Sequence, residues 1–294
     1  MNLTLRQLQV FVSVASHGSI TQAAETLFIT KPAVSMALAE LEKQLGHPLF
    51  DRQKNRLYLN HQGNTLLPYA NELLQRSDAI ASLFSQESRL TGNLAIGCSD
   101  TVGNHLAPPL LKAFRDKTGH LQQSLHISNT RKICQQLIDF ELDIGLVEGH
   151  VASPDLVAIP WRGDNMIVAC ASGDPLAKSR TIQLSDLEDQ QWLLREKGSG
   201  TRAFFLEHIG TKLSRWHLAF ELNNTEALIN ACAAELGLIC LSKIALQHAL
   251  DDGRLHFLYQ MDHSQRTFHL VYHKQKYQSP LIQAFIEFCH QWQP

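Results

Sequence analysis

The first sixty residues carry helix start and stop signals placed so closely together that they define three short helices. Apolar residues recur at intervals of three or four: Leu5, Leu8, Val12 and Ala15. Gly18 is placed to end this first helix, because glycine readily adopts the left-handed conformation of a C-cap. Ser19 and Thr30 are suited to cap a second and a third helix, and Pro32 stands in the first turn of the third, where a missing N–H is harmless. Gly46 is expected to end the third helix.

The third helix has a face opposite its apolar stripe that is expected to be exposed. That face consists of Lys31, Ser35, Met36, Ala39 and Lys43. Two helices joined by a tight turn, the second with short polar and basic side chains at its start, are typical of the helix-turn-helix motif, whose second helix enters the DNA major groove. A polar turn at 54–55 then separates two short strands and predicts a basic hairpin, or wing, that carries Arg52, Lys54 and Arg56.

This N-terminal segment resembles the winged helix-turn-helix of the LysR family of bacterial transcriptional regulators over more than forty contiguous residues. The resemblance rests on the motifs AAxxL and PAVSxxxxxLExxLGxxLF and on the wing, within SITQAAETLFITKPAVSMALAELEKQLGHPLFDRQKNRLYLNHQG. It implies that Lys31, Pro32 and Ser35 lie at base edges of promoter DNA. The residues expected at the DNA backbone are Thr21, Arg52, Lys54 and Arg56. Lys31 stands where many family members carry glutamine, so the operator bases that it reads stay open.

Residues 61–90 form an expected linker helix with a coiled-coil-like stripe. Its members are Leu66, Ala70, Leu73, Ser77, Ile80 and Phe84, with Leu67, Leu74 and Ala81 alongside. One lone helix has too little protein around it to bury such a stripe, so the same helix of a second subunit is the expected partner. The resemblance implies a dimer, and by family habit a tetramer. Pro68 predicts either a kink or a later helix start.

The remaining two hundred residues alternate short apolar strands with helices, which predicts a mainly parallel sheet with helices on both faces. The expected fold is an N-terminal all-α winged helix-turn-helix with a long linker helix, followed by a C-terminal α/β two-lobed domain that, by resemblance, is similar to periplasmic binding proteins. The expected boundaries are 1–60 for the DNA-binding domain, 61–90 for the linker, and 91–294 for an effector-binding domain whose lobe I is 91–161 with 268–294 and whose lobe II is 162–267.

Polar residues gather where strands of this domain end, the place at which α/β proteins bind ligands. The candidate effector-binding residues are Ser99, Thr101, Asn129, Thr130, Glu148, Arg195, Ser199, Gly200, Thr201 and Thr225. Simple helix capping is the alternative explanation for each serine, threonine or asparagine among them. The run GSGTR at 198–202 has the hydroxyls and main-chain N–H groups to hold a small anion, which favours an inorganic oxyanion or a carboxylate as the effector.

The composition excludes several other classes of protein. The net charge of −2 argues against indiscriminate nucleic-acid coating, and no apolar run approaches the roughly 20 residues that span a bilayer. We therefore expect a cytoplasmic regulator, associated with the nucleoid when it is bound to DNA. Its expected partners are promoter DNA, the effector, further copies of itself and RNA polymerase.

No catalytic motif, metal-type cluster or cofactor fingerprint is present, so no enzyme, metal or cofactor is expected. A secreted solute receptor would need a signal sequence and no winged helix. The six cysteines are interpreted as core thiols, with a redox pair assembled by the fold left open. The identity of the effector, the operator, and activation as against repression are not readable from the sequence.

Overall fold

The computed structural model describes residues 2–53, 56–82, 90, 92–260 and 264–293. Its contacts divide the chain into two compact units, Met1–Gly92 with Tyr277–Leu281, and Asn93–Lys276 with Ile282–Pro294. Each unit is described by itself. The finer domain and lobe boundaries given above stay predictions.

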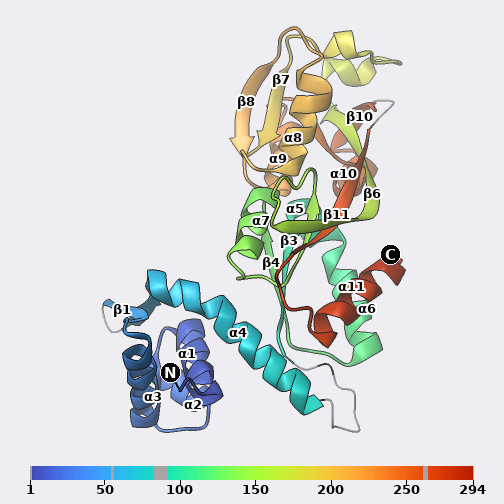
Figure 1. The fold of residues 1–294 in the computed structure, drawn as a ribbon. Helices are drawn as coiled ribbons and strands as arrows, with labels where there is room; N and C mark the ends of the chain where they lie inside the picture. The colour runs from blue at the N-terminus through green and yellow to red at the C-terminus, as the bar shows by residue number, and fades with distance from the viewer. Residues whose placement is uncertain (1, 54–55, 83–89, 91, 261–263, 294) are drawn as a thin grey trace. The chain divides into compact units, whose positions relative to one another are not determined.

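The first unit begins with the three helices that the caps predict (Figure 1). They are α1 (Leu5–His17), α2 (Ile20–Thr26) and α3 (Lys31–Leu45). The side chains of Thr4, Ser19 and Thr30 accept hydrogen bonds from backbone N–H groups at the three N-termini. Gly18 and Gly46 end α1 and α3 with φ of 62° and 74°. Local capping chemistry thus sets where all three helices start, and where two of them end.

The wing and the linker helix follow. Strands β1 (Phe50–Gln53) and β2 (Arg56–Leu59) pair antiparallel, and α4 runs through Pro68 from His61 to Ser82, so the helix does not start later than expected. Part of the α4 stripe packs on the core of its own unit, namely Leu66, Leu67, Ala70 and Leu74. Tyr69, Leu73 and Ile80 stay exposed, and Phe84 lies outside the described residues. The expectation that the whole stripe needs a second subunit is therefore only half right.

The second unit holds two α/β lobes. Lobe I contains β3 (Leu94–Ser99), α5 (Asp100–His105), α6 (Ala107–Thr118), β4 (Gln123–Ser128), α7 (Thr130–Ile138), β5 (Ile144–Glu148) and, from Ile282 on, α11 (Pro280–Gln291). Lobe II contains η1 (Pro175–Lys178), η2 (Leu184–Leu187), β7 (Gln191–Arg195), α8 (Gly200–Phe205), a turn of π-helix η3 (Leu206–Gly210), β8 (His217–Leu222), α9 (Thr225–Ala233), β9 (Ile239–Ser242), α10 (Lys243–Asp251) and β10 (Leu255–Tyr259).

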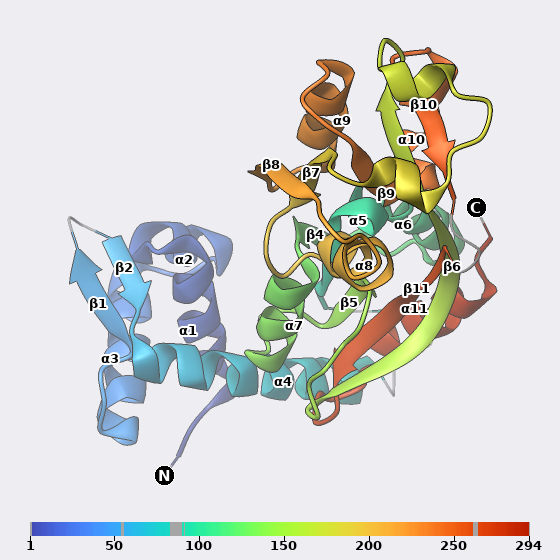
Figure 2. The same cartoon turned by 90° about the horizontal axis from the view of Figure 1, so that it is seen from above.

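Two long strands, β6 (Leu156–Ala171) and β11 (Gln265–His273), lie side by side and join the lobes (Figures 1 and 2). One curled sheet runs through both lobes in the order β10-β6-β11-β5-β3-β4, with β9 also paired to β6. Among the described strands of this unit, β3 pairs parallel with β4 and with β5, β7 pairs parallel with β8, and an isolated parallel bridge joins Trp192 to Leu238. The expected mainly parallel sheet is thus a mixed one, because both crossing strands pair antiparallel with their neighbours.

The start of α4 generates a stability prediction. A methyl group on Gly63 would lie inside van der Waals contact with the Leu49 carbonyl oxygen and the Leu59 side chain. We expect Gly63→Ala to destabilise the first unit by about 1–3 kcal/mol through overpacking, which lowers its melting temperature by several degrees in calorimetry of the full chain. Asn64→Ala, one residue along on the exposed face of the same helix, is the control and should melt as the native chain does. Equal melting of both variants would contradict this packing.

Candidate functional site

The wing and the start of α2 surround a basic hollow in the first unit. Thr21, Arg52 and Arg56 line a cavity of about 510 Å³ together with Gly18, Ser19, Ile20 and Leu57. A hydrogen bond from Leu57 N to Gly18 O, 2.9 Å long, ties the wing to the α1–α2 turn. Both arginines are exposed, and neither has a carboxylate partner within the part of the chain that the structure describes. The hollow has the charge and the hydroxyl donor that a phosphate group requires.

The remaining predicted DNA contacts lie on α3. Lys31, Pro32 and Ser35 are all exposed on its first two turns, whereas Val34 and Leu38 are buried. The structure thus brings Thr21, Arg52 and Arg56 together at the wing. Lys31, Pro32 and Ser35 occupy a separate face, on α3. Lys54, also predicted as a DNA contact, lies outside the described residues.

Arg266 on β11 is the centre of a buried polar cluster where the two lobes meet. Its Nε donates to Asp164 Oδ2 on the neighbouring strand β6 at 2.7 Å, and its side chain is only 4% exposed. Nη1 donates to Thr201 Oγ1 at 3.0 Å and Nη2 to Thr101 Oγ1 at 3.2 Å. Nη2 also forms an ion pair with Glu148 Oε2 at 3.2 Å. One guanidinium therefore contacts both crossing strands and both lobes.

A second buried arginine, Arg195 at the end of β7, makes the neighbouring contacts. Its Nη1 lies 3.1 Å from Asp100 Oδ2 of lobe I, and it also donates to Thr225 Oγ1 at 3.2 Å. The hydroxyl of Thr225 donates in turn to Asp100. Nε of Arg195 pairs with Glu196 at 2.9 Å, and Asn129 of lobe I donates to the same carboxylate at 3.0 Å. Two of these contacts, Arg195 with Asp100 and Asn129 with Glu196, join lobe II to lobe I.

The surroundings of the Glu196 carboxylate favour its ionised form. Burial by itself would raise the pKa of Glu196, but the hydrogen bonds from Arg195 and Asn129, and the charge of Arg195, outweigh burial and lower this pKa below its ordinary value. Because the pKa is lowered on folding, the stability that Glu196 contributes is present above the unfolded value and is lost as pH falls through the folded one.

All ten predicted effector residues lie in this region between the lobes, but only four of them line its cavity. A cavity of about 560 Å³ opens there, and Thr130, Glu148, Ser199 and Gly200 face it. The other six are used in the polar cluster or buried beside it: Ser99, Thr101, Asn129, Arg195, Thr201 and Thr225. Capping, the alternative explanation, holds for Asn129, whose side chain accepts from Lys132 N. The hydroxyls of Ser99 and Ser199 are buried without a hydrogen-bond partner among the described residues.

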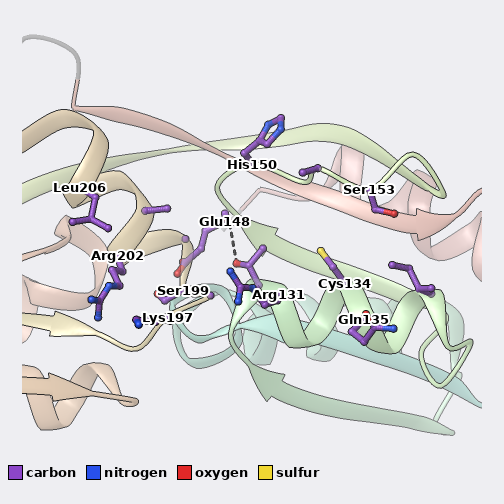
Figure 3. Close-up of a pocket in the computed structure, with 16 residues that line it drawn as sticks. Arg131, Cys134, Gln135, Glu148, His150, Ser153, Lys197, Ser199, Arg202 and Leu206 are labelled. Atoms are coloured by element: carbon purple, nitrogen blue, oxygen red, sulfur yellow. Dashed lines mark hydrogen bonds between the residues drawn. The ribbon is translucent and has the colours of Figure 1, made fainter. Parts of the chain in front are cut away.

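The cavity is basic, which the sequence analysis did not single out. Arg131 on α7 and Lys197 after β7 line it from the two lobes, and Arg202 on α8 joins them (Figure 3). Arg202 pairs with Glu221, and the carboxylate of Glu148 pairs with Arg266. Arg131 and Lys197 are exposed and have no carboxylate partner in the described parts of the chain. The lining also includes the apolar side chains of Cys134, Ile138, Ala152, Ala203 and Leu206, and the residues Gln135, His150, Ser153 and Gly198.

The six cysteines are free, and all but Cys134 are buried. Burial raises the pKa of Cys134 to about 11 and that of Cys240 to about 12, and it raises the thiol pKa at the other four positions as well. A thiol with a raised pKa is a poor nucleophile at neutral pH, which favours core thiols over a redox pair.

Within the described residues, no cluster of histidine, cysteine or acidic side chains is arranged to hold a metal ion, and no helix is long and apolar enough to cross a membrane.

Comparison with known proteins matches both units. Residues 5–64 match the family model "Bacterial regulatory helix-turn-helix protein, lysR family", and residues 87–294 match "LysR substrate binding domain". The uncharacterized HTH-type transcriptional regulator YeiE of Escherichia coli K12 is 36% identical over 290 residues, which cover 98% of each chain. Among solved structures, a full-length OxyR variant from Pseudomonas aeruginosa has a TM-score of 0.78 at 21% identity over 100% of both chains.

The effector-binding part has a separate structural relative. The regulatory domain of Synechocystis PCC6803 CcmR in complex with 2-PG has a TM-score of 0.63 at 25% identity, and covers 68% of this chain and 97% of that one. A winged helix-turn-helix joined to a two-lobed domain of this kind defines a DNA-binding regulator with a ligand-binding domain. The chain belongs to the LysR family of bacterial transcriptional regulators. Its relatives are named as regulators, in agreement with the expectation that it is not an enzyme.

The role of Arg266 can be tested by stability. Arg266→Ala leaves Asp164 and Glu148 without their guanidinium, so we expect the second unit to lose about 3–5 kcal/mol of stability. Arg266→Lys should lose less but still a measurable amount, because an ammonium cannot reproduce the planar set of donors. Arg254→Ala, which removes an exposed ion pair with Asp252, is the matched control and should cost about 1 kcal/mol or less. Chemical denaturation of the full chain measures all three, and equal losses for Arg266→Ala and Arg254→Ala would refute a central role for Arg266.

Proposed function

We propose that this LysR-type regulator binds promoter DNA sequence-specifically and that a small anion, held between the two lobes of its effector-binding domain, controls its activity. The observation that carries the proposal is the pair of cations Arg131 and Lys197, which line one cavity from opposite lobes and have no carboxylate partner among the described residues. The regulator acts at DNA, and therefore in the cytoplasm, together with RNA polymerase at its promoters.

The charges around the cavity support an anion. Glu148 is the one carboxylate in the lining among the described residues, and it shares the guanidinium of Arg266 with Asp164. Even with the full charge of Glu148 counted, Arg131 and Lys197 leave the lining with an excess of positive charge. Ser199 is 3% exposed, and its hydroxyl, which has no partner among the described residues, is placed to donate to the same anion. An oxyanion or a carboxylate supplies the acceptors that these three groups require.

The cavity volume bears on the kind of anion. About 560 Å³ lies within the range that protein pockets use for organic ligands. Cys134, Ile138 and Leu206 provide an apolar wall beside the cations. This arrangement favours a carboxylate with a carbon body over an inorganic oxyanion, and the CcmR domain, a relative bound to 2-PG, is consistent with a small ligand of this class.

The DNA contacts follow from the first unit. Arg52, Arg56 and Thr21 hold backbone phosphates at the basic hollow, and Lys31, Pro32 and Ser35 on α3 approach base edges. Tyr69, Leu73 and Ile80 remain exposed along α4 and support a dimer through the linker helix, with a tetramer as the larger assembly. A twofold pair of α3 helices requires a pseudo-palindromic site.

The DNA contact of the wing can be measured by its salt dependence. Fluorescence anisotropy on DNA from upstream of the gene, with scrambled DNA as the control, should show preference for the native sequence. Arg56→Ala should weaken binding and reduce the slope of log K against log salt by about one, because one phosphate contact is lost. Arg180→Ala, an exposed arginine of the second unit, is the control and should keep the native slope. An unchanged slope for Arg56→Ala would remove the wing from the interface.

The effector site can be tested without knowing the natural ligand. Thermal unfolding is followed with sulfate, phosphate and a panel of simple carboxylates at constant ionic strength. We expect at least one anion to raise the melting temperature of the second unit, with about 2.7 kcal/mol gained when the anion reaches 100 times its Kd. The double variant Arg131→Ala/Lys197→Ala should lose most of that gain, because the two cations supply the charge attraction.

Lys212→Ala, an exposed lysine of lobe II outside the cavity, is the control for non-specific charge effects. It should keep the native response. Stabilisation that is equal in the double variant and in the native protein would place the anion elsewhere. A response to sulfate and phosphate alone would identify an inorganic oxyanion instead of a carboxylate.

A further inference from the structure

We propose that Met36 reads the 5-methyl group of a thymine in the operator and so sets the base preference at one position of each half-site. The inference rests on the proposed placement of α3 in the major groove. Met36 is the sixth residue of α3 and its side chain is 75% exposed, although methionine is usually a core residue. The solvent-facing side of a helix ordinarily carries polar and charged residues, and an exposed methionine departs from that pattern.

Met36 lies on the outward face of α3. At 100° per residue, Met36 lies opposite the buried stripe of Val34, Leu38 and Leu41. It shares its outward direction with Pro32, one turn earlier, and with Lys43, two turns later. In a helix-turn-helix protein this outward face of the first turns lies against the base edges.

The side chains that precede Met36 on the exposed face are short, namely Pro32, Ala33 and Ser35. Glu40, one turn later, accepts a hydrogen bond from Gln44. Met36 is therefore the longest exposed side chain that follows Lys31 in the first two turns of α3. The side chain that reaches furthest is the one that approaches the floor of the groove.

Chemistry decides which base Met36 contacts. A thioether chain donates no hydrogen bond and its sulfur accepts only weakly, so it cannot pair with guanine O6 or adenine N7. The only apolar group that a base presents in the major groove is the thymine methyl. Removing both the methyl and the methionine surface from water is favourable, while contact with any other base edge would bury a polar group against carbon.

The experiment compares thymine with deoxyuridine, which pairs identically and lacks only the methyl group. Full-length protein first selects its operator from a random duplex library. Each thymine of one half-site is then replaced singly by deoxyuridine, and Kd is measured by fluorescence anisotropy for the native protein, for Met36→Ala and for Met36→Leu. Because Met36 is exposed and alanine favours helices, both variants should fold, which a thermal melt checks.

At one thymine, deoxyuridine should weaken native binding about fourfold, the equivalent of about 0.8 kcal/mol for one methyl group. Met36→Ala should bind the two DNAs equally, and Met36→Leu should retain the difference. A native protein indifferent to deoxyuridine at every position, or a difference that persists in Met36→Ala, would overturn the contact while leaving DNA recognition intact. Failure to select any operator would instead overturn the placement of α3 and, with it, the Met36 contact.

Discussion

The guanidinium of Arg266 is the interaction on which the second unit depends. It lies on a strand that crosses between the lobes, bonds to the other crossing strand through Asp164, and contacts lobe I through Thr101 and Glu148. A buried carboxylate without such a partner costs several kcal/mol, so these acidic groups are tolerable only because one cation serves them. Glu148 shares this cation with Asp164, and even its full charge offsets only one of the two cations, Arg131 and Lys197, that line the neighbouring cavity without a carboxylate partner among the described residues. This balance of charge supports the proposed anionic ligand.

The sequence predicted correctly those parts of the fold that have local causes. The caps Thr30 and Gly46 lie next to the helix that they delimit, and their hydrogen bonds span only a few residues. The middle of β6 was not foreseen, because 162–165 reads Arg-Gly-Asp-Asn, which lacks the apolar residues of a strand, and its strand conformation depends on pairing with β11, about a hundred residues away. The helix α10 and strand β10 were also missed, and the antiparallel pairing of the crossing strands turned an expected parallel sheet into a mixed one.

In the candidate site too, the features with local causes were predicted and those that depend on distant residues were not. Strand ends led to ten residues that do gather between the lobes, but nothing in the sequence separates a serine that lines the cavity, such as Ser199, from one buried beside it, such as Ser99. Asp164 and Arg266 were missed because their partners are far along the chain. The chemistry of the cysteines also depends on packing, because burial raises the pKa of the thiols and opposes thiolate formation.

The placement of the cavity cations links the proposed ligand to the geometry of the lobes. Arg131 belongs to lobe I, whereas Lys197 and Arg202 belong to lobe II, so without an anion like charges face one another across the cavity. The cluster around Arg266 and the contact between Arg195 and Asp100 oppose that repulsion and keep the lobes together. An anion between the cations replaces repulsion by attraction, and it does so only where the lobes are close enough for both sides to reach it. Its affinity must therefore differ between closer and wider arrangements of the lobes, and a difference in affinity is what allows a ligand to shift a conformational equilibrium.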